Sequence, residues 1–107
     1  MVGCTGLIEA PEIPSSVTSM HATFTGCTGL TSAPEIPTSV TEMESTFSGC
    51  TSLTGTLTIN ANPTDYSGCL ENAATNEGCN LVLNGSSTVL NEILATKSEN
   101  SNISLGN

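Results

Sequence analysis

The sequence contains no arginine and a single lysine, Lys97, whereas ten aspartate and glutamate residues bring its formal net charge to -9. Proteins that bind nucleic acids rely largely on lysine and arginine to neutralise phosphates, so this composition argues against a nucleic-acid partner. Anionic membrane surfaces are disfavoured on the same ground. The negative charge also keeps a chain soluble, which is the simpler explanation for it.

Tryptophan is absent, and the aromatic side chains are Phe24, Phe47 and Tyr66. At 107 residues the chain is expected to form one domain. Its core must therefore come mainly from leucine, isoleucine, valine, methionine, alanine, proline and cysteine. Side chains of this size suit thin, repeated layers better than one large centre.

Long apolar stretches are also missing. A transmembrane helix needs about 18 consecutive apolar residues, and no segment approaches that length, so membrane insertion is not expected. The N-terminus lacks the basic, apolar and small-residue order of a signal peptide, and any export signal is expected to lie outside this chain. The polar, weakly charged composition is common among extracellular proteins and predicts an extracellular or cell-surface location.

What the sequence does contain is a repeat. The segment FTGCTGL at 24–30 returns as FSGCTSL at 47–53, which gives a period of 23 residues. The same interval separates several further series: Cys4, Cys27 and Cys50; Leu7, Leu30 and Leu53; Ile13, Ile36 and Ile59; and Met20, Met43 and Tyr66. A period in this range indicates stacked structural repeats.

A fourth unit is predicted after a step of 24 residues, which places Leu81 and Leu83 in the positions of Leu57 and Ile59. The chain is therefore interpreted as a single domain, 1–107, whose coils lie at about 3–25, 26–48, 49–72 and 73–107. Met1 stands at the place of an aromatic residue in later units. We accordingly expect a fragment lacking its N-terminal neighbours, with an open first coil that favours self-association.

Each unit is predicted to contribute one short strand, at the segments APEI, APEI, TLTI and NLVL. Alternation of inward and outward positions gives an outward row of four side chains: Glu12, Glu35, Thr58 and Val82. Because successive units run in one direction, their strands should pair in parallel. Pro11 and Pro34 cannot donate ladder hydrogen bonds, so the first two strands should be short and irregular and the last two better formed.

Short helical turns are expected after the strands, because apolar residues recur at i, i+4 in three pairs: Met20 and Phe24, Met43 and Phe47, and Tyr66 and Leu70. Thr41 and Glu44 have the spacing of a capping box. The last segment, STVLNEILATK, is predicted to be a longer helix with a buried stripe of Val89, Leu90, Ile93 and Leu94. It is expected to close the C-terminal end, with Lys97 favouring the helix C-terminus.

The cysteines lack the CxxC pairs of a zinc site. Their 23-residue spacing predicts a buried ladder of reduced thiols formed by Cys4, Cys27 and Cys50. A disulfide between stacked coils is the alternative. Cys69 is expected to fall outside the ladder, where Ala73 or Ala74 takes its place, and the states of Cys69 and Cys79 are left open.

The remaining polar residues give no catalytic pattern. Glu12 and Glu35 are interpreted as a solvated acidic face, with a cation or partner site as the alternative. His21 is replaced by Glu44 in the next unit and is expected to lie at the surface. Neither a GxSxG motif nor a phosphate-binding loop occurs, so we expect no enzyme, no cofactor and no metal.

The repeat resembles the BspA-like leucine-rich repeats of bacterial surface proteins through the pattern MxxTFxGCTxLTSAPEIPxSVT. The likeness is close over Met1 to Gly55, and from Thr56 to Asn107 it rests on register alone, where it resembles divergent final repeats and an end cap. The resemblance implies an α/β fold: a right-handed solenoid with short parallel strands on its concave side and short helical turns opposite. Members are implicated in adhesion to host proteins or cells, and they share no catalytic residues.

The leading hypothesis is therefore a non-enzymatic binding or structural module of a bacterial surface or secreted protein. Its expected partner is another protein, such as a host extracellular or cell-surface protein, bound on the concave row Glu12, Glu35, Thr58 and Val82. The alternative is a metal-dependent or hydrolytic module that uses the carboxylates of the same face.

Overall fold

The computed structural model describes residues 6–10 and 12–106. Its regular elements are strand β1 (Gly55–Thr58), strand β2 (Leu81–Asn84), helix α1 (Leu90–Leu94) and strand β3 (Ile103–Leu105). The strands form one parallel sheet in the order β1-β2-β3, as expected. The chain thus forms a compact body with a small three-stranded parallel sheet and one short helix.

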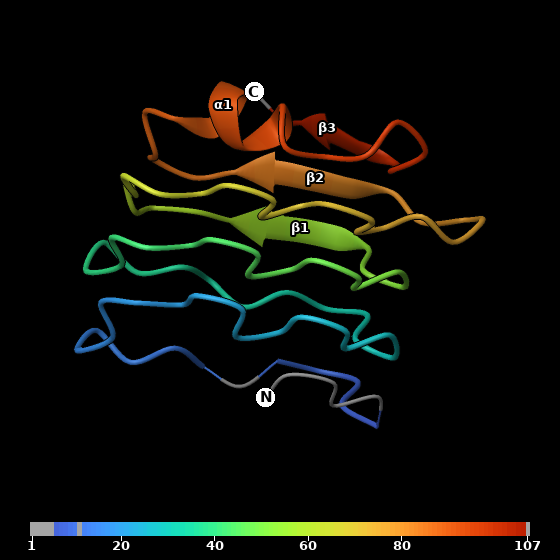
Figure 1. Cartoon of the computed structure of the whole chain (residues 1–107), viewed down its shortest axis with the longest axis horizontal. Coiled ribbons are helices and arrows are strands. Elements are labelled where there is room, and N and C mark those ends of the chain that lie inside the picture. Colours follow the sequence, from blue (N-terminus) through green and yellow to red (C-terminus); the bar gives the residue numbers. More distant parts are fainter. Residues whose placement is uncertain (1–5, 11, 107) are drawn as a thin grey trace.

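Figure 1 shows the chain passing back and forth in successive layers, from the N-terminal segment at one end to α1 and β3 at the other. Backbone hydrogen bonds join neighbouring layers at separations close to the sequence period. The Phe24 N–H donates to the Thr46 carbonyl, and the Phe47 N–H donates to the Cys69 carbonyl, both at 2.9 Å. Hydroxyl groups add to these links, since Thr41 Oγ1 donates to the carbonyl of Thr18 at 3.1 Å.

The segments TLTI and NLVL form β1 and β2, which confirms them as the better strands of the four. The segment APEI at 33–36 contributes a single parallel bridge, between Ile36 and Ile59. Pro34 and Pro37 flank this bridge and have no N–H to donate, which explains why the pairing stops there. The equivalent Pro11 lies outside the described residues.

The step between β1 and β2 is 26 residues and not the predicted 24. Leu57 pairs with Leu83, whereas the sequence alignment had matched it to Leu81. The shift of two positions keeps inward residues facing inward, because side chains alternate with a period of two. Leu57, Leu81 and Leu83 are therefore all fully buried.

The additional residues lie in the loop at 74–80. The Ala74 N–H donates to the Cys50 carbonyl, a separation of 24, whereas the Asn80 N–H donates to Thr54 Oγ1, a separation of 26. A turn at Glu77 and Gly78 accommodates the extra length. The sequence alignment missed it because Leu81 and Leu83 are chemically interchangeable.

The predicted helical turns are isolated turns and not α-helix. In the second layer, the Thr46 N–H donates to the Met43 carbonyl and the Cys50 N–H to the Phe47 carbonyl, three residues apart. Left-handed backbone interrupts any helix, since Ser45 has φ of 56° and Gly49 has φ of 78°. This conformation recurs at 23-residue intervals in two series: Ala22, Ser45 and Gly68, and Gly26, Gly49 and Asn72.

The capping box predicted for Thr41 and Glu44 is wrong. Thr41 directs both its N–H and its hydroxyl to the carbonyl of Thr18 in the layer before. Glu44 lies instead beside His21, in the same neighbouring layer. Contacts between layers thus take the groups that a helix would have used locally.

Helix α1 is shorter than the predicted segment and has no side-chain cap. Leu90 and Ile93 are buried, as expected, and Val89 and Leu94 pack beside them. Lys97 follows the helix and is not in its last turn. The helix is also not the final element, because β3 follows it and pairs with β2, so the two together cover this end of the chain.

The core runs through the layers as columns of equivalent side chains. Phe24 and Phe47 are fully buried and stack on each other, with ring centroids 5.6 Å apart and 10° between the ring planes. Burial is weaker in the first layer, where Leu7 and Ile13 are only half-buried. Their counterparts one layer on, Leu30 and Ile36, are fully buried.

Candidate functional site

The outward row predicted on the strands is present in part. Glu35 and Thr58 belong to neighbouring layers, because the Ile36 N–H donates to the Thr58 carbonyl at 2.8 Å. Thr58 pairs in turn with Asn84, which replaces Val82 as its neighbour. Glu12 and Glu35 are exposed, as expected.

Val82 lies in a second row on the same face. It pairs with Thr56 of β1 and with Ser104 of β3, and its side chain is half-buried. The correction follows from the two-residue shift of β2, which moves each residue along the strand without turning it over. We call the two rows together the strand face: Glu35, Thr58 and Asn84 in one row, and Thr56, Val82 and Ser104 in the other.

Glu35 is held in place by an asparagine that sequence reasoning missed. Asn60 Nδ2 donates to Glu35 Oε2 at 2.9 Å. The same side chain accepts through Oδ1 from the Ser86 N–H at 3.0 Å and from Ser86 Oγ at 3.2 Å. Asn60 thereby ties three layers together. The sequence signal was the polar pair Asn60 and Asn84, which the repeat alignment had matched to each other.

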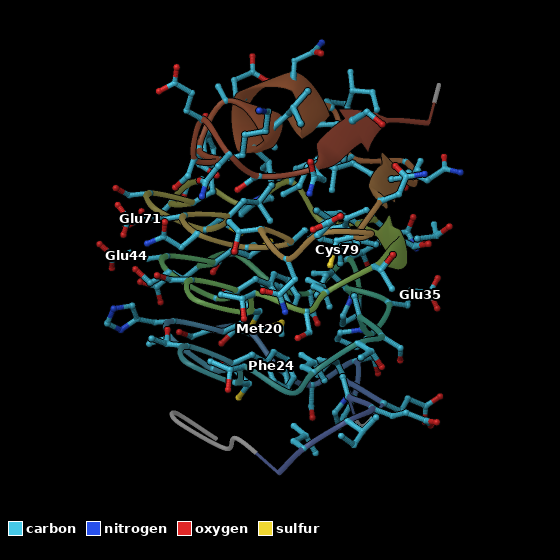
Figure 2. All side chains as sticks on the ribbon, turned by 90° about the vertical axis from the view of Figure 1, so that its right-hand side faces the viewer. Met20, Phe24, Glu35, Glu44, Glu71 and Cys79 are labelled. Carbon is cyan, nitrogen blue, oxygen red and sulfur yellow. The ribbon has the colours of Figure 1, made fainter. Side chains whose placement is uncertain are left out.

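A second group of acidic residues lies away from the strand face. Figure 2 shows Glu44 and Glu71 on one side of the molecule and Glu35 on the opposite side. His21 Nε2 lies 3.2 Å from Glu44 Oε1, and both side chains are largely open to solvent, at 60% and 43% exposed. The surface position predicted for His21 is therefore confirmed.

The acidic residues do not converge on a metal. In the described part of the chain, no group of three or more histidine, cysteine, aspartate or glutamate side chains is arranged to hold an ion. Residues 6–10 and 12–106 also enclose no pocket. Enzymatic chemistry on a small substrate usually needs an enclosed, partly desolvated cavity.

The cysteines occupy the core. Cys27, Cys50 and Cys69 are fully buried, and Cys79 is half-buried. Cys50 Sγ donates to the Phe24 carbonyl at 3.0 Å. The ladder position of Cys4 lies outside the described residues, and the described cysteines are present as thiols and not as disulfides.

Cys69 is closer to the ladder than predicted. It interacts electrostatically with Cys50, and Ala73 and Ala74 are buried as well, so cysteine and alanine share this part of the column. Burial raises the pKa of both the Cys50 and the Cys69 thiol to about 12. Thiols with so high a pKa carry almost no thiolate at neutral pH and are poor nucleophiles.

No protein-family model, curated protein or solved structure matches this chain. The functional argument therefore rests on the surfaces just described. None of the described helices has the length and apolar character needed to cross a membrane. Among these surfaces, the strand face is the one that combines regular backbone with side chains not needed by the core.

Proposed function

We propose that the chain is a non-enzymatic binding module, built as a right-handed leucine-rich repeat solenoid of the BspA-like type and displayed on or secreted from a bacterial cell. The parallel sheet supports this reading, as do the inter-layer bonds near a 23-residue spacing and the buried columns of repeated side chains. In such a solenoid the strand face is the concave side and the turns lie opposite.

The proposed partner is a protein, such as a host extracellular or cell-surface protein, that docks on the strand face. The observation that carries this proposal is the fixed position of Glu35, whose carboxylate is bonded by Asn60 while remaining exposed. A side chain held in one place loses less entropy when it binds. Half-buried Val82 beside it offers apolar contact, so a patch with basic and apolar side chains is the expected complement.

The test compares binding by variants on the two sides of the molecule. We expect Glu35→Lys and Val82→Lys to weaken capture of host extracellular proteins by roughly tenfold or more, as loss of a central contact does. The matched controls Glu44→Lys and Glu71→Lys make the same charge change as Glu35→Lys on the other side (Figure 2) and should leave binding intact. Equal loss from all four would indicate nonspecific charge effects and contradict the proposal.

Self-association through the first layer is part of the same proposal. Leu7, Ile13 and Val17 are only half-buried, and Ile8 is 54% exposed, although the repeat places such residues against a further layer. Light scattering at increasing concentration should show a rise in mass that Ile8→Glu abolishes. A strict monomer at high concentration would contradict this part.

A further inference from the structure

The end of β2 brings an amide nitrogen against a side-chain carboxamide. Asn84 is the last residue of β2, and the N–H of the following Gly85 donates to Asn84 Oδ1 at 2.9 Å. Since a carbonyl carbon lies about 1.2 Å from its oxygen, the Asn84 Cγ is within about 4 Å of the Gly85 nitrogen. We propose that Asn84 is a modification site that deamidates spontaneously in the folded protein.

The Gly85 N–H is not one of the bonds that hold the sheet at this point. Those bonds are made from the Ile59 N–H to the Asn84 carbonyl and from the Gly106 N–H to the Leu83 carbonyl, both at 2.8 Å. The proton that must leave the Gly85 nitrogen is therefore removed without breaking the sheet. Glycine also places no side chain beside its nitrogen, so the approach to Asn84 Cγ is unhindered.

The reaction needs only water and a base. Hydroxide removes the Gly85 amide proton, and the nitrogen attacks Asn84 Cγ. A bond forms between these two atoms, the bond from Cγ to Nδ2 breaks, and Nδ2 leaves as ammonia. Water then opens the cyclic imide at either carbonyl. Opening at Cγ yields aspartate with the original backbone, and opening at the Asn84 backbone carbonyl yields isoaspartate with one more methylene in the chain.

The two products have different effects. Aspartate at position 84 adds a negative charge to the row that holds Glu35 and Thr58, and the backbone is unchanged. Isoaspartate lengthens the backbone where Gly85 is already tight, because a Cβ on Gly85 would lie 2.4 Å from the Ile59 carbonyl oxygen. We therefore expect the isoaspartate form to weaken the pairing of β1 with β2. The modification itself does not depend on the proposed binding function.

Asn60 supplies an internal control. Its carboxamide is taken up on both sides, by Glu35 and by Ser86, and the next residue, Ala61, is buried. Asn102 supplies another, because its amide donates to the Asn76 carbonyl at 3.3 Å and the next residue is β-branched Ile103. Both are expected to stay intact while Asn84 reacts.

The experiment incubates the folded chain at mildly acidic and mildly alkaline pH and digests it after glutamate. This cleavage releases Asn84 in the fragment 78–92 and Asn102 in the fragment 100–107, with Asn60 in a third fragment. Mass spectrometry should show conversion of amide to acid at Asn84 roughly tenfold or more faster than at Asn60 or Asn102, as expected when the reacting atoms are held together. The rate should rise with hydroxide concentration, and both isomers should appear.

Two variants and one condition make the outcome decisive. Asn84→Gln lengthens the side chain away from a five-membered ring and should abolish the mass change at this position. Asn84→Asp should match the aspartate product in charge and chromatographic behaviour. If Asn84 reacts in urea but not in the folded chain, the sheet protects it and the proposal is overturned. Equal rates at Asn84, Asn60 and Asn102 would overturn it as well.

Discussion

The Phe24 and Phe47 rings stack in the core at a centroid distance of 5.6 Å, one layer apart. Both are fully buried, and Leu70 continues the column on the other side of Phe47. Phe47→Ala should therefore cost about 3–5 kcal/mol of the free energy of unfolding, measured by urea denaturation, because a cavity opens between two layers. Phe47→Leu should cost distinctly less, since leucine fills this position in the next unit. Equal costs would contradict a stacked column.

Ser45 pays for a left-handed backbone that its equivalent in the next unit, Gly68, adopts freely. Its φ is 56°. Ser45→Gly should raise stability by about 0.5–1 kcal/mol, because glycine removes the steric cost of this conformation. The matched control is Ser48→Gly in the same turn, which is not in this conformation and should lose about 0.5–1 kcal/mol. Thermal melts of both variants decide the question, and a shift of the same sign in both would contradict it.

Ser101 buries a hydroxyl without a hydrogen-bond partner, and the residue is only 6% exposed. Ser101→Ala should leave stability unchanged or raise it by about 1 kcal/mol, because no bond is lost and an unsatisfied polar group is removed. Thr46 provides the contrast, since its buried Oγ1 donates to the Met20 carbonyl at 2.8 Å. Thr46→Val keeps the shape and should cost about 1–3 kcal/mol. Denaturant midpoints that fall in both variants would contradict the assignment of Ser101.

Burial of Cys50 and Cys69 predicts alkaline destabilisation. In the unfolded chain these thiols ionise near the ordinary pKa of 9.0, whereas in the folded chain the pKa is about 12. The folded form thus binds more protons between these values, and stability should be constant below pH 9 and fall as pH rises toward 12. Cys69→Ala should flatten part of this fall in urea titrations, and a stability curve that does not depend on pH in this range would contradict it.

The same burial predicts the order of thiol labelling. In the native protein at mildly alkaline pH, half-buried Cys79 should react before Cys50 and Cys69, whose labelling should wait for unfolding. Peptide-resolved mass spectrometry separates the sites, and a denatured sample serves as the control in which all react. Rapid native labelling of Cys69 would show that the core column opens readily.

Much of the fold follows from the repeat in the sequence. Identical side chains at 23-residue intervals predicted the parallel pairing, the burial of Phe24 and Phe47 and the inward residues of β1 and β2. The period alone did not specify the backbone within each turn. The i, i+4 spacing of Met43 and Phe47 suggested a helix, but the left-handed residues between and after them prevent one.

The strand face was predicted less well, because its composition depends on register. Glu35 and Thr58 were placed correctly, but Asn84 and Val82 were exchanged by an alignment that could choose either Leu81 or Leu83. Contacts between layers were also outside what spacing can show. The bond from Asn60 to Glu35 joins residues 25 positions apart, and no local pattern predicts it.

The longer loop before β2 bears on which insertions this chain tolerates. It lengthens the step between strands by an even number relative to the 23-residue interval that the repeat alignment predicted plus the one residue already allowed for, so Leu81 and Leu83 still point inward. A loop changed by a single residue would turn β2 over, exposing its leucines and burying Val82 and Asn84. Length variants of this loop should therefore survive in steps of two, and a natural or engineered collection of such variants would be expected to show that parity.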